Sequence, residues 1–137
     1  MEKKGEVKFL SPDTLAKNPA YSQVAVISGP HKTIYVGGQN AVDRNGNIIG
    51  KGDIAKQSQQ ILHNIGEALK SAGAGFEHIV KWNIYFLKGV SPQDALKEFQ
   101  PALSKLKSPP LVTGIFVESL ARPEFLLEIE VTAVLPE

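Results

Sequence analysis

The chain has 137 residues, of which 42% are hydrophobic and 21% charged, a composition typical of one compact globular domain spanning residues 1–137. Fifteen Lys and Arg against fourteen Asp and Glu leave a formal net charge of +1, which is too small to favour nucleic acid or an anionic membrane as partner. The chain has no cysteine, which excludes a disulfide scaffold, a thiol nucleophile and any cysteine-ligated metal site.

The N-terminus shows no sign of a targeting segment. Met1 is followed by charged residues, and no apolar run approaches the roughly 18 residues that a membrane span needs. We therefore expect a cytoplasmic protein without a membrane partner.

The first elements expected are three short strands, over 7–10, 23–28 and 33–36, separated by turns rich in proline, asparagine and glycine.

Two adjacent glycines then interrupt the apolar pattern. Gly37 and Gly38 predict a β-bulge or a close approach of the backbone to another group. Asn45 and Gly46, between apolar flanks, predict a tight turn or hairpin, because both residue types accept a positive φ.

The second half of the chain alternates helices and strands. Apolar residues at three- and four-residue steps predict a helix over 54–72, capped by Asp53 and stopped by Gly73. Strict alternation over 79–87 predicts a strand with one buried face. A second helix begins after Ser91 and runs to about residue 106, and Pro101 within it predicts a kink or a division. Two last strands are expected over 111–117 and 126–135.

This order predicts an α+β fold with a mixed six-stranded sheet and two amphipathic helices on one of its faces. The helices leave the opposite face of the sheet without a cover. A partner subunit is the simplest cover, so we expect a homo-oligomer.

Histidines and carboxylates are the candidate chemical groups. His31, His63 and His78 have no mutual spacing typical of metal ligands, and no metal site is predicted. Glu128 and Glu130 lie two residues apart in a strand, so both face the same side of the sheet. A solvated or ion-paired edge is one interpretation of them; a carboxylate lining a cleft, able to handle protons or hold a water, is the other.

Two further features leave alternatives open. The backbone around Gly37 and Gly38 has two interpretations. Its exposed N–H groups bind a carbonyl or carboxylate, or the segment is a bulge without a ligand. Tyr21, after the turn at Pro19, is either a pocket wall or a surface aromatic. Basic residues are scattered without interleaved aromatics, so no nucleic-acid partner is expected.

Taken in order, these segments resemble the Rid/YjgF family, also called endoribonuclease L-PSP. The segments that carry the resemblance are 19–22, 34–39, 52–57, 64–65, 72–74, 79–81 and 126–134. The resemblance covers nearly the whole chain. It implies a chorismate-mutase-like fold, a homotrimer with clefts between subunits, and hydrolysis of enamine and imine intermediates to a 2-keto acid and ammonia without a cofactor.

The resemblance also implies roles for individual residues. Glu128 matches the carboxylate that positions the attacking water, Gly38 the glycine whose backbone faces the ligand, and Tyr21 the tyrosine of the cleft. Three other cleft positions depart from the family pattern. They are Val112, where the family has an arginine that clamps the substrate carboxylate, Gly37, where it has serine, and Gly114, where a cysteine is common.

These residues support more than one function. The first hypothesis is a Rid-type deaminase acting on a small-molecule imine or enamine different from those derived from amino acids, because an arginine clamp has no apolar substitute. Arg122 is the candidate to replace that clamp by another route. The second hypothesis is a non-catalytic ligand-binding or chaperone-like trimer, and the third is an endoribonuclease.

Overall fold

A computed structural model describes residues 3–137. Its strands are β1 (Glu6–Leu10), β2 (Val24–Ser28), β3 (His31–Gln39), β4 (Ile79–Leu87), β5 (Leu111–Val117) and β6 (Leu127–Pro136). Its helices are α1 (Ile54–Ser71), α2 (Pro92–Leu96) and α3 (Gln100–Leu103), with short 3-10 turns η1 (Phe76–His78) and η2 (Lys97–Phe99). The element order confirms the predicted α+β organisation.

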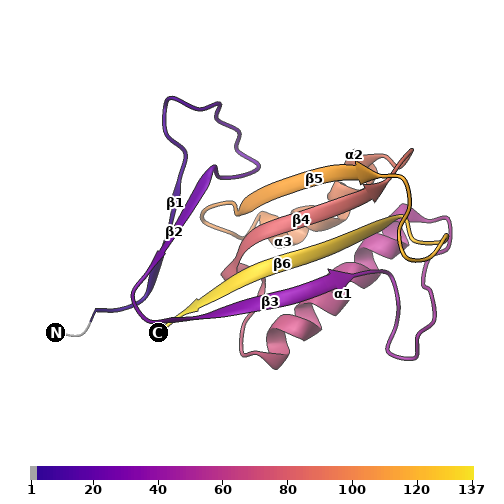
Figure 1. Cartoon of the computed structure of the whole chain (residues 1–137), viewed down its shortest axis with the longest axis horizontal. Coiled ribbons are helices and arrows are strands. Elements are labelled where there is room, and N and C mark those ends of the chain that lie inside the picture. Colours follow the sequence, from indigo (N-terminus) through magenta and orange to yellow (C-terminus); the bar gives the residue numbers. More distant parts are fainter. Residues whose placement is uncertain (1–2) are drawn as a thin grey trace.

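The strands form two sheets rather than the single six-stranded sheet expected from the sequence. β3, β6, β4 and β5 pair in that order, with β4 and β5 parallel and the other pairs antiparallel, so the sheet is mixed. β1 and β2 form a separate antiparallel ribbon that projects from one end of the molecule (Figure 1).

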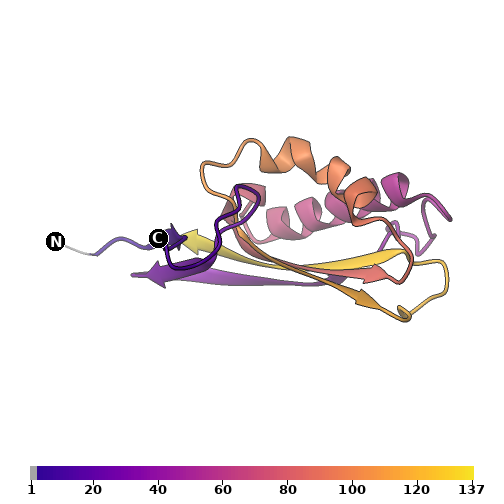
Figure 2. The ribbon, with the colours of Figure 1, turned by 90° about the horizontal axis from the view of Figure 1, so that it is seen from above.

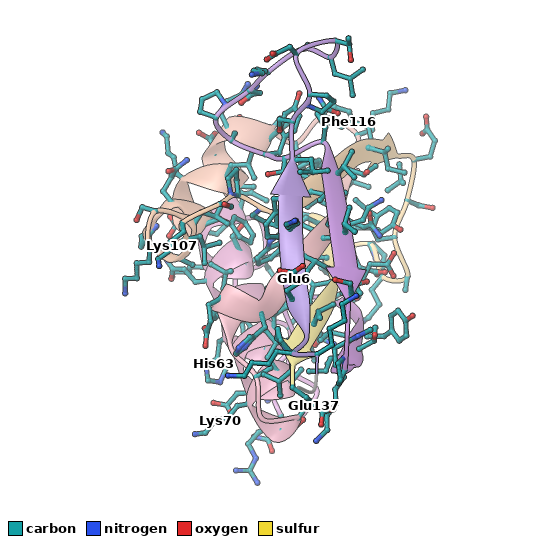
Figure 3. The ribbon with its side chains drawn as sticks, turned by 90° about the vertical axis from the view of Figure 1, so that its left-hand side faces the viewer. Glu6, His63, Lys70, Lys107, Phe116 and Glu137 are labelled. Atoms are coloured by element: carbon teal, nitrogen blue, oxygen red, sulfur yellow. The ribbon has the colours of Figure 1, made fainter. Side chains whose placement is uncertain are left out.

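A tight turn explains this division. Gly29, at a φ of 75°, and Pro30 reverse the chain between β2 and β3, and the two strands leave the turn in different directions. The ribbon is held to the end of β6 by hydrogen bonds from Gly5 N to Glu137 O (2.8 Å) and from Glu137 N to Pro30 O (2.9 Å). Figure 3 views the molecule from this end, with the ribbon in front of the sheet.

Helix α1 packs its apolar side on the four-stranded sheet. Asp53 caps it by accepting a hydrogen bond from Lys56 N (3.1 Å), and Gly73 ends it at a φ of 78°. Ile61, Ile65 and Leu69 are fully buried along one side of the helix. The cap, the stop and the buried side are those predicted from the sequence.

The second helical segment is divided, as Pro101 predicts. Ser91 caps α2 by accepting from Asp94 N (3.3 Å), η2 follows, and Pro101 lies in the first turn of α3. The segment ends at Leu103, so the predicted extension to residue 106 was wrong. Both helical segments lie on the same side of the sheet (Figure 2). Within residues 3–137, no helix combines the length and the hydropathy needed to cross a bilayer.

The two faces of the four-stranded sheet differ in chemistry. The helix-facing side is apolar, and Trp82 on β4 stacks near Phe76 and meets Phe99 edge-on at 5.7 Å between ring centroids. The opposite side, here called the open face, carries polar side chains along β4 and β6. Exposed apolar side chains gather mainly on β5 and on the β1–β2 ribbon, and Tyr35 and Ile115 lie at the two edges of the open face. Hydrophobic burial by itself therefore does not require a cover over the centre of the open face.

Candidate functional site

The bulge predicted at the paired glycines is present in β3. Val36 pairs with Val131 and Gln39 with Ile129, so Gly37 and Gly38 together oppose a single residue of β6. The irregularity lies beside the open face of the sheet.

Gly38 makes room for the carboxylate of Glu128. A β-carbon at Gly38 would collide with Glu128 Oε2 and would lie 2.8 Å from the carboxyl carbon. A β-carbon at Gly37 would meet no atom within 4 Å. The close approach predicted from the glycine pair is therefore specific to Gly38, and its partner is the Glu128 side chain.

Glu128 and Glu130 share the open face but have different surroundings. Glu130 Oε1 accepts hydrogen bonds from the Tyr85 hydroxyl (2.8 Å) and from Asn83 Nδ2 (3.1 Å). The hydrogen bond to Glu130 is the main cause that raises the pKa of Tyr85, followed by desolvation and by the charges of Glu130 and Glu128. Within residues 3–137, no group donates a hydrogen bond to the Glu128 carboxylate, which leaves it available to a water or a ligand.

A second group of predicted site residues lies at the start of β5. Ser22 donates hydrogen bonds from its N–H to Pro110 O (3.2 Å) and from its Oγ to Pro109 O (2.6 Å). These bonds hold the half-buried Tyr21 beside a depression of about 340 Å³ lined by Pro19 and Pro109. Tyr21 is therefore fixed next to the strand that carries Val112 and Gly114.

Val112 and Gly114 turn towards the helix side of the sheet. Val112 pairs with Trp82 and Gly114 with Ile84, both of which belong to the buried core, and paired residues share a face. Val112 is nevertheless 38% exposed, because β5 is an edge strand of the sheet. A β-carbon at Gly114 would contact Phe86 Cε2 at 3.5 Å, an ordinary van der Waals distance.

The structure thus sorts the predicted residues into two groups, here called the carboxylate group and the edge group. The carboxylate group is Gly37, Gly38 and Glu128; the edge group is Tyr21, Val112 and Gly114. β4 separates β6 from β5, a spacing of roughly 10 Å across the sheet at the usual distance between strands, and Val112 and Gly114 lie on the opposite face from Glu128. One protomer does not bring the two groups together.

The three histidines lie in separate parts of the molecule. His31 Nδ1 lies 2.9 Å from Gly29 O, and His78 Nδ1 accepts from Gly75 N (3.0 Å). His63 lines a groove of about 700 Å³ between α1 and the 40–50 excursion. Within residues 3–137, no three His, Asp or Glu side chains are grouped in a way that would hold a metal ion.

Arg122 does not reach the edge group in this protomer. Its guanidinium lies 5.9 Å from the ring centroid of Phe125, within the loop that joins β5 to β6. Sequence reasoning missed Tyr85 and Asn83, the partners of Glu130. The alternation over 79–87 placed both on the polar side of β4, but only the register with β6 shows that they meet Glu130.

Comparisons with known proteins agree with this fold. The pattern of the family described as endoribonuclease L-PSP matches residues 12–135. A crystal structure of a protein of unknown function from the conserved Rid protein family of Yersinia pestis has a TM-score of 0.82 and 30% identity, covering 94% of this chain and 98% of that one.

Sequence relatives point to the same family. A RutC family protein of Synechocystis is 31% identical over 117 residues, 85% of this chain and 86% of that protein. A rat protein named 2-iminobutanoate/2-iminopropanoate deaminase is 38% identical over 65 residues, so the match spans 47% of this chain and 45% of the rat protein. Family match, fold and full-length relatives together show that this chain belongs to the Rid/YjgF, or endoribonuclease L-PSP, family.

Proposed function

We propose that this protein hydrolyses a small imine or enamine in clefts between the subunits of a homotrimer. The observation that carries the proposal is the Glu128 carboxylate, which lies against the backbone of Gly38 and receives no hydrogen bond from the rest of residues 3–137. A carboxylate in that state can accept a proton from a bound water. The name of the mammalian relatives, iminobutanoate and iminopropanoate deaminase, supports the same chemistry.

The reaction adds water across a carbon–nitrogen double bond. Glu128 takes a proton from water as the oxygen attacks the imine carbon and delivers it to the nitrogen, which gives a carbinolamine. The carboxylate then takes the hydroxyl proton of this intermediate and delivers it to the nitrogen as the carbon–oxygen double bond forms and the carbon–nitrogen bond breaks. The products are a carbonyl compound and ammonia. Gly38 N–H polarises the reacting group, because a backbone donor fixed beside the carboxylate needs no reorganisation during the reaction. Water addition and proton transfer need no cofactor.

The two residue groups explain why an assembly is needed. In one copy of the chain Glu128 lies on the open face, whereas Val112 and Gly114 turn to the helix side. A neighbouring copy that presents its β5 edge to the open face would join the carboxylate group of one subunit to the edge group of the next. We therefore assign Tyr21, Val112 and Gly114 of one copy, and Gly37, Gly38 and Glu128 of its neighbour, to each cleft.

Position 112 argues for a substrate other than the amino-acid-derived imines. The resemblance aligns Val112 with the arginine that holds a substrate carboxylate, and valine offers neither charge nor hydrogen bond. A carboxylate placed against Val112 would lose its hydration without gaining a partner.

Hydrolysis assays with Glu128→Gln test the proposal. Two imine sources are supplied, 2-aminoacrylate from a dehydratase and the imine that an amine oxidase releases from a primary amine, and carbonyl product is followed. We expect the wild type to accelerate at least one of them and Glu128→Gln to lose about 100-fold or more of that rate. Glu118→Gln, an exposed carboxylate paired with Lys88, is the matched control and is expected to keep the wild-type rate.

The second candidate is a trimer that binds a ligand without turning it over. It is favoured by the uncharged character of β5, which offers neither a base nor a cation to a ligand. Ligand binding without acceleration of any imine would support it against the hydrolase. RNA cleavage that persists through extensive purification would favour the ribonuclease named in the family description.

A further inference from the structure

Three alternate residues of β5 form an apolar strip on one side of the edge strand. Val112, Gly114 and Phe116 pair with Trp82, Ile84 and Phe86 of β4, so all three face the same way. We call these three residues the β5 strip. Phe116, labelled in Figure 3, is at one end of the strip and Val112 at the other, beside the Tyr21 loop.

The strip is open to solvent and contains a gap. Val112 is 38% exposed and Phe116 58% exposed. Between them, Gly114 leaves the space that a methyl group would fill, because a β-carbon there would touch Phe86 Cε2 at 3.5 Å without collision. The packing therefore tolerates a side chain at position 114, and the glycine leaves a recess whose floor is the Phe86 ring.

Two aromatic rings line this recess, Phe86 beneath it and Phe116 next to Phe86. The Phe116 ring centroid lies 5.8 Å from that of Phe86, with the planes tilted by 41°. Rings at this distance attract one another, and a third ring placed over the recess would pack mainly on Phe116, because Phe86 is only 5% exposed. An aryl group placed there would thus gain a ring–ring contact that an alkyl chain would not.

The strip carries no charge, and two lysines near its ends are ion-paired. Residues 111–117 include no Asp, Glu, Lys or Arg. Lys17, in the depression beside Tyr21, pairs with Asp13 at 2.6 Å, and Lys88, beyond the end of β5, pairs with Glu118 at 3.2 Å. A ligand carboxylate on the strip would lack a partner, whereas an uncharged ring would bury apolar area on both sides.

We propose that the β5 strip binds the aryl group of an uncharged aromatic imine, with the imine carbon directed towards Glu128 of the neighbouring subunit. The reaction converts ArCH=NH and water into ArCHO and ammonia. The reaction part rests on the proposed function, while binding of an uncharged aryl group to the strip is measured without turnover.

Benzamide and benzoate are a matched pair of probes, because they differ in charge and little in shape. Backbone amide shifts of the assembled protein are followed by NMR as each is added. We expect benzamide to shift the amides of Gly114 and Phe116 and to bind about tenfold or more tighter than benzoate. Equal affinity for the two, or shifts confined to residues outside β5, would overturn the proposal. So would the absence of binding because a neighbouring copy covers the strip.

Substitutions on the strip sharpen the test. Gly114→Val fills the recess and is expected to weaken the binding of benzamide by about tenfold. Thr113→Val, on the opposite face of the same strand, is expected to leave the affinity for benzamide unchanged. Val112→Arg supplies a cation and is expected to reverse the preference in favour of benzoate. Thermal melting confirms that each variant is folded. Equal losses in Gly114→Val and Thr113→Val would contradict a specific subsite.

Turnover separates this inference from the proposed function. Benzaldimine, generated from benzylamine by an amine oxidase, and the imine of phenylglycine, generated by an amino-acid oxidase, differ by one carboxylate. We expect the wild type to favour benzaldimine by about tenfold or more. Benzamide binding on the strip with hydrolysis of neither imine would refute the proposed function alone. Hydrolysis of both imines with a preference for the imine of phenylglycine, which carries the carboxylate, would refute the subsite alone.

Discussion

The two faces of the four-stranded sheet are made by the same strands and differ in burial and polarity. Along β6, Leu127 and Ile129 are fully buried under the helices. Glu128 and Glu130, which alternate with them, lie half-buried on the open face. Strand alternation alone produces this separation. Adjacent residues can therefore be expected to differ completely in their effects, with stability on one face and chemistry on the other.

The largest effect on stability is expected from Ile129→Ala. This residue is fully buried in the core, and truncation there leaves a cavity that costs about 2–5 kcal/mol of unfolding free energy. The neighbouring Glu128→Gln is expected to change the same quantity by less than about 1 kcal/mol, because its side chain lies on the open face. Denaturant unfolding measures both losses of unfolding free energy. Similar losses for the two substitutions would contradict the proposed difference between the two faces.

A smaller difference is expected between the paired glycines. Gly38→Ala introduces a β-carbon where the Glu128 carboxylate lies, and because the displaced group is the end of a flexible, half-buried side chain, the expected cost in stability is about 1 kcal/mol or less, with a clear reduction of imine hydrolysis. Gly37→Ala places its methyl in open space and is expected to leave stability nearly unchanged. Thermal melting of the two variants, followed by the hydrolysis assay, tests this asymmetry. Equal sensitivity at both positions would show that Gly38 does not set the place of Glu128.

The third expected effect depends on pH and concerns the open face. Tyr85 has a raised pKa because its hydroxyl donates to Glu130, so the folded state favours the protonated phenol. That contribution is complete below the unfolded value of 10.0 and is lost as pH rises through the folded pKa. Tyr85→Phe is expected to flatten the fall in stability above pH 10, measured by denaturant unfolding across alkaline buffers. An unchanged alkaline profile would contradict the network.

The smallest effect is expected at Asp43, which belongs to neither face. Its carboxylate accepts from the N–H groups of Asn45 and Asn47, each at 2.9 Å, and these bonds lower its pKa, the bond from Asn47 most. The folded pKa lies below 3.8, so this contribution is present above pH 3.8 and is lost as pH falls through the folded value. Asp43→Asn is expected to increase amide hydrogen exchange in the 40–50 excursion at neutral pH and to leave the core amides unchanged. Faster exchange throughout the chain would contradict a local role.

Sequence patterns predicted the fold well where periodicity and capping agree. Helix α1 begins after Asp53 and ends before Gly73 as expected, and Pro101 divides the second helical segment. The prediction of a single six-stranded sheet was wrong. The sequences of β2 and β3 predict two strands, but they do not fix the direction that the chain takes after the turn at Gly29 and Pro30. Local patterns specify elements, and the pairing between them depends on turn geometry.

The candidate site was predicted in pieces. The glycine pair indicated a close approach, but its partner, the Glu128 side chain, comes from the far end of the chain and is visible only in the register of β3 with β6. Tyr85 and Asn83 were missed for the same reason. One copy of the chain does not bring Glu128 and Val112 together, so their meeting in one cleft stays a prediction about the assembly.

Subunit complementation tests most directly the claim that each cleft takes its carboxylate group and its edge group from different copies. Glu128→Gln and Val112→Asp, each retaining the trimer and each inactive in imine hydrolysis, are unfolded together in equal amounts, refolded and assayed. If the groups come from neighbouring subunits, random mixing restores about one quarter of the clefts and a corresponding share of the wild-type rate. If both groups come from the same subunit, no cleft is restored and the mixture stays inactive, which would contradict the shared cleft.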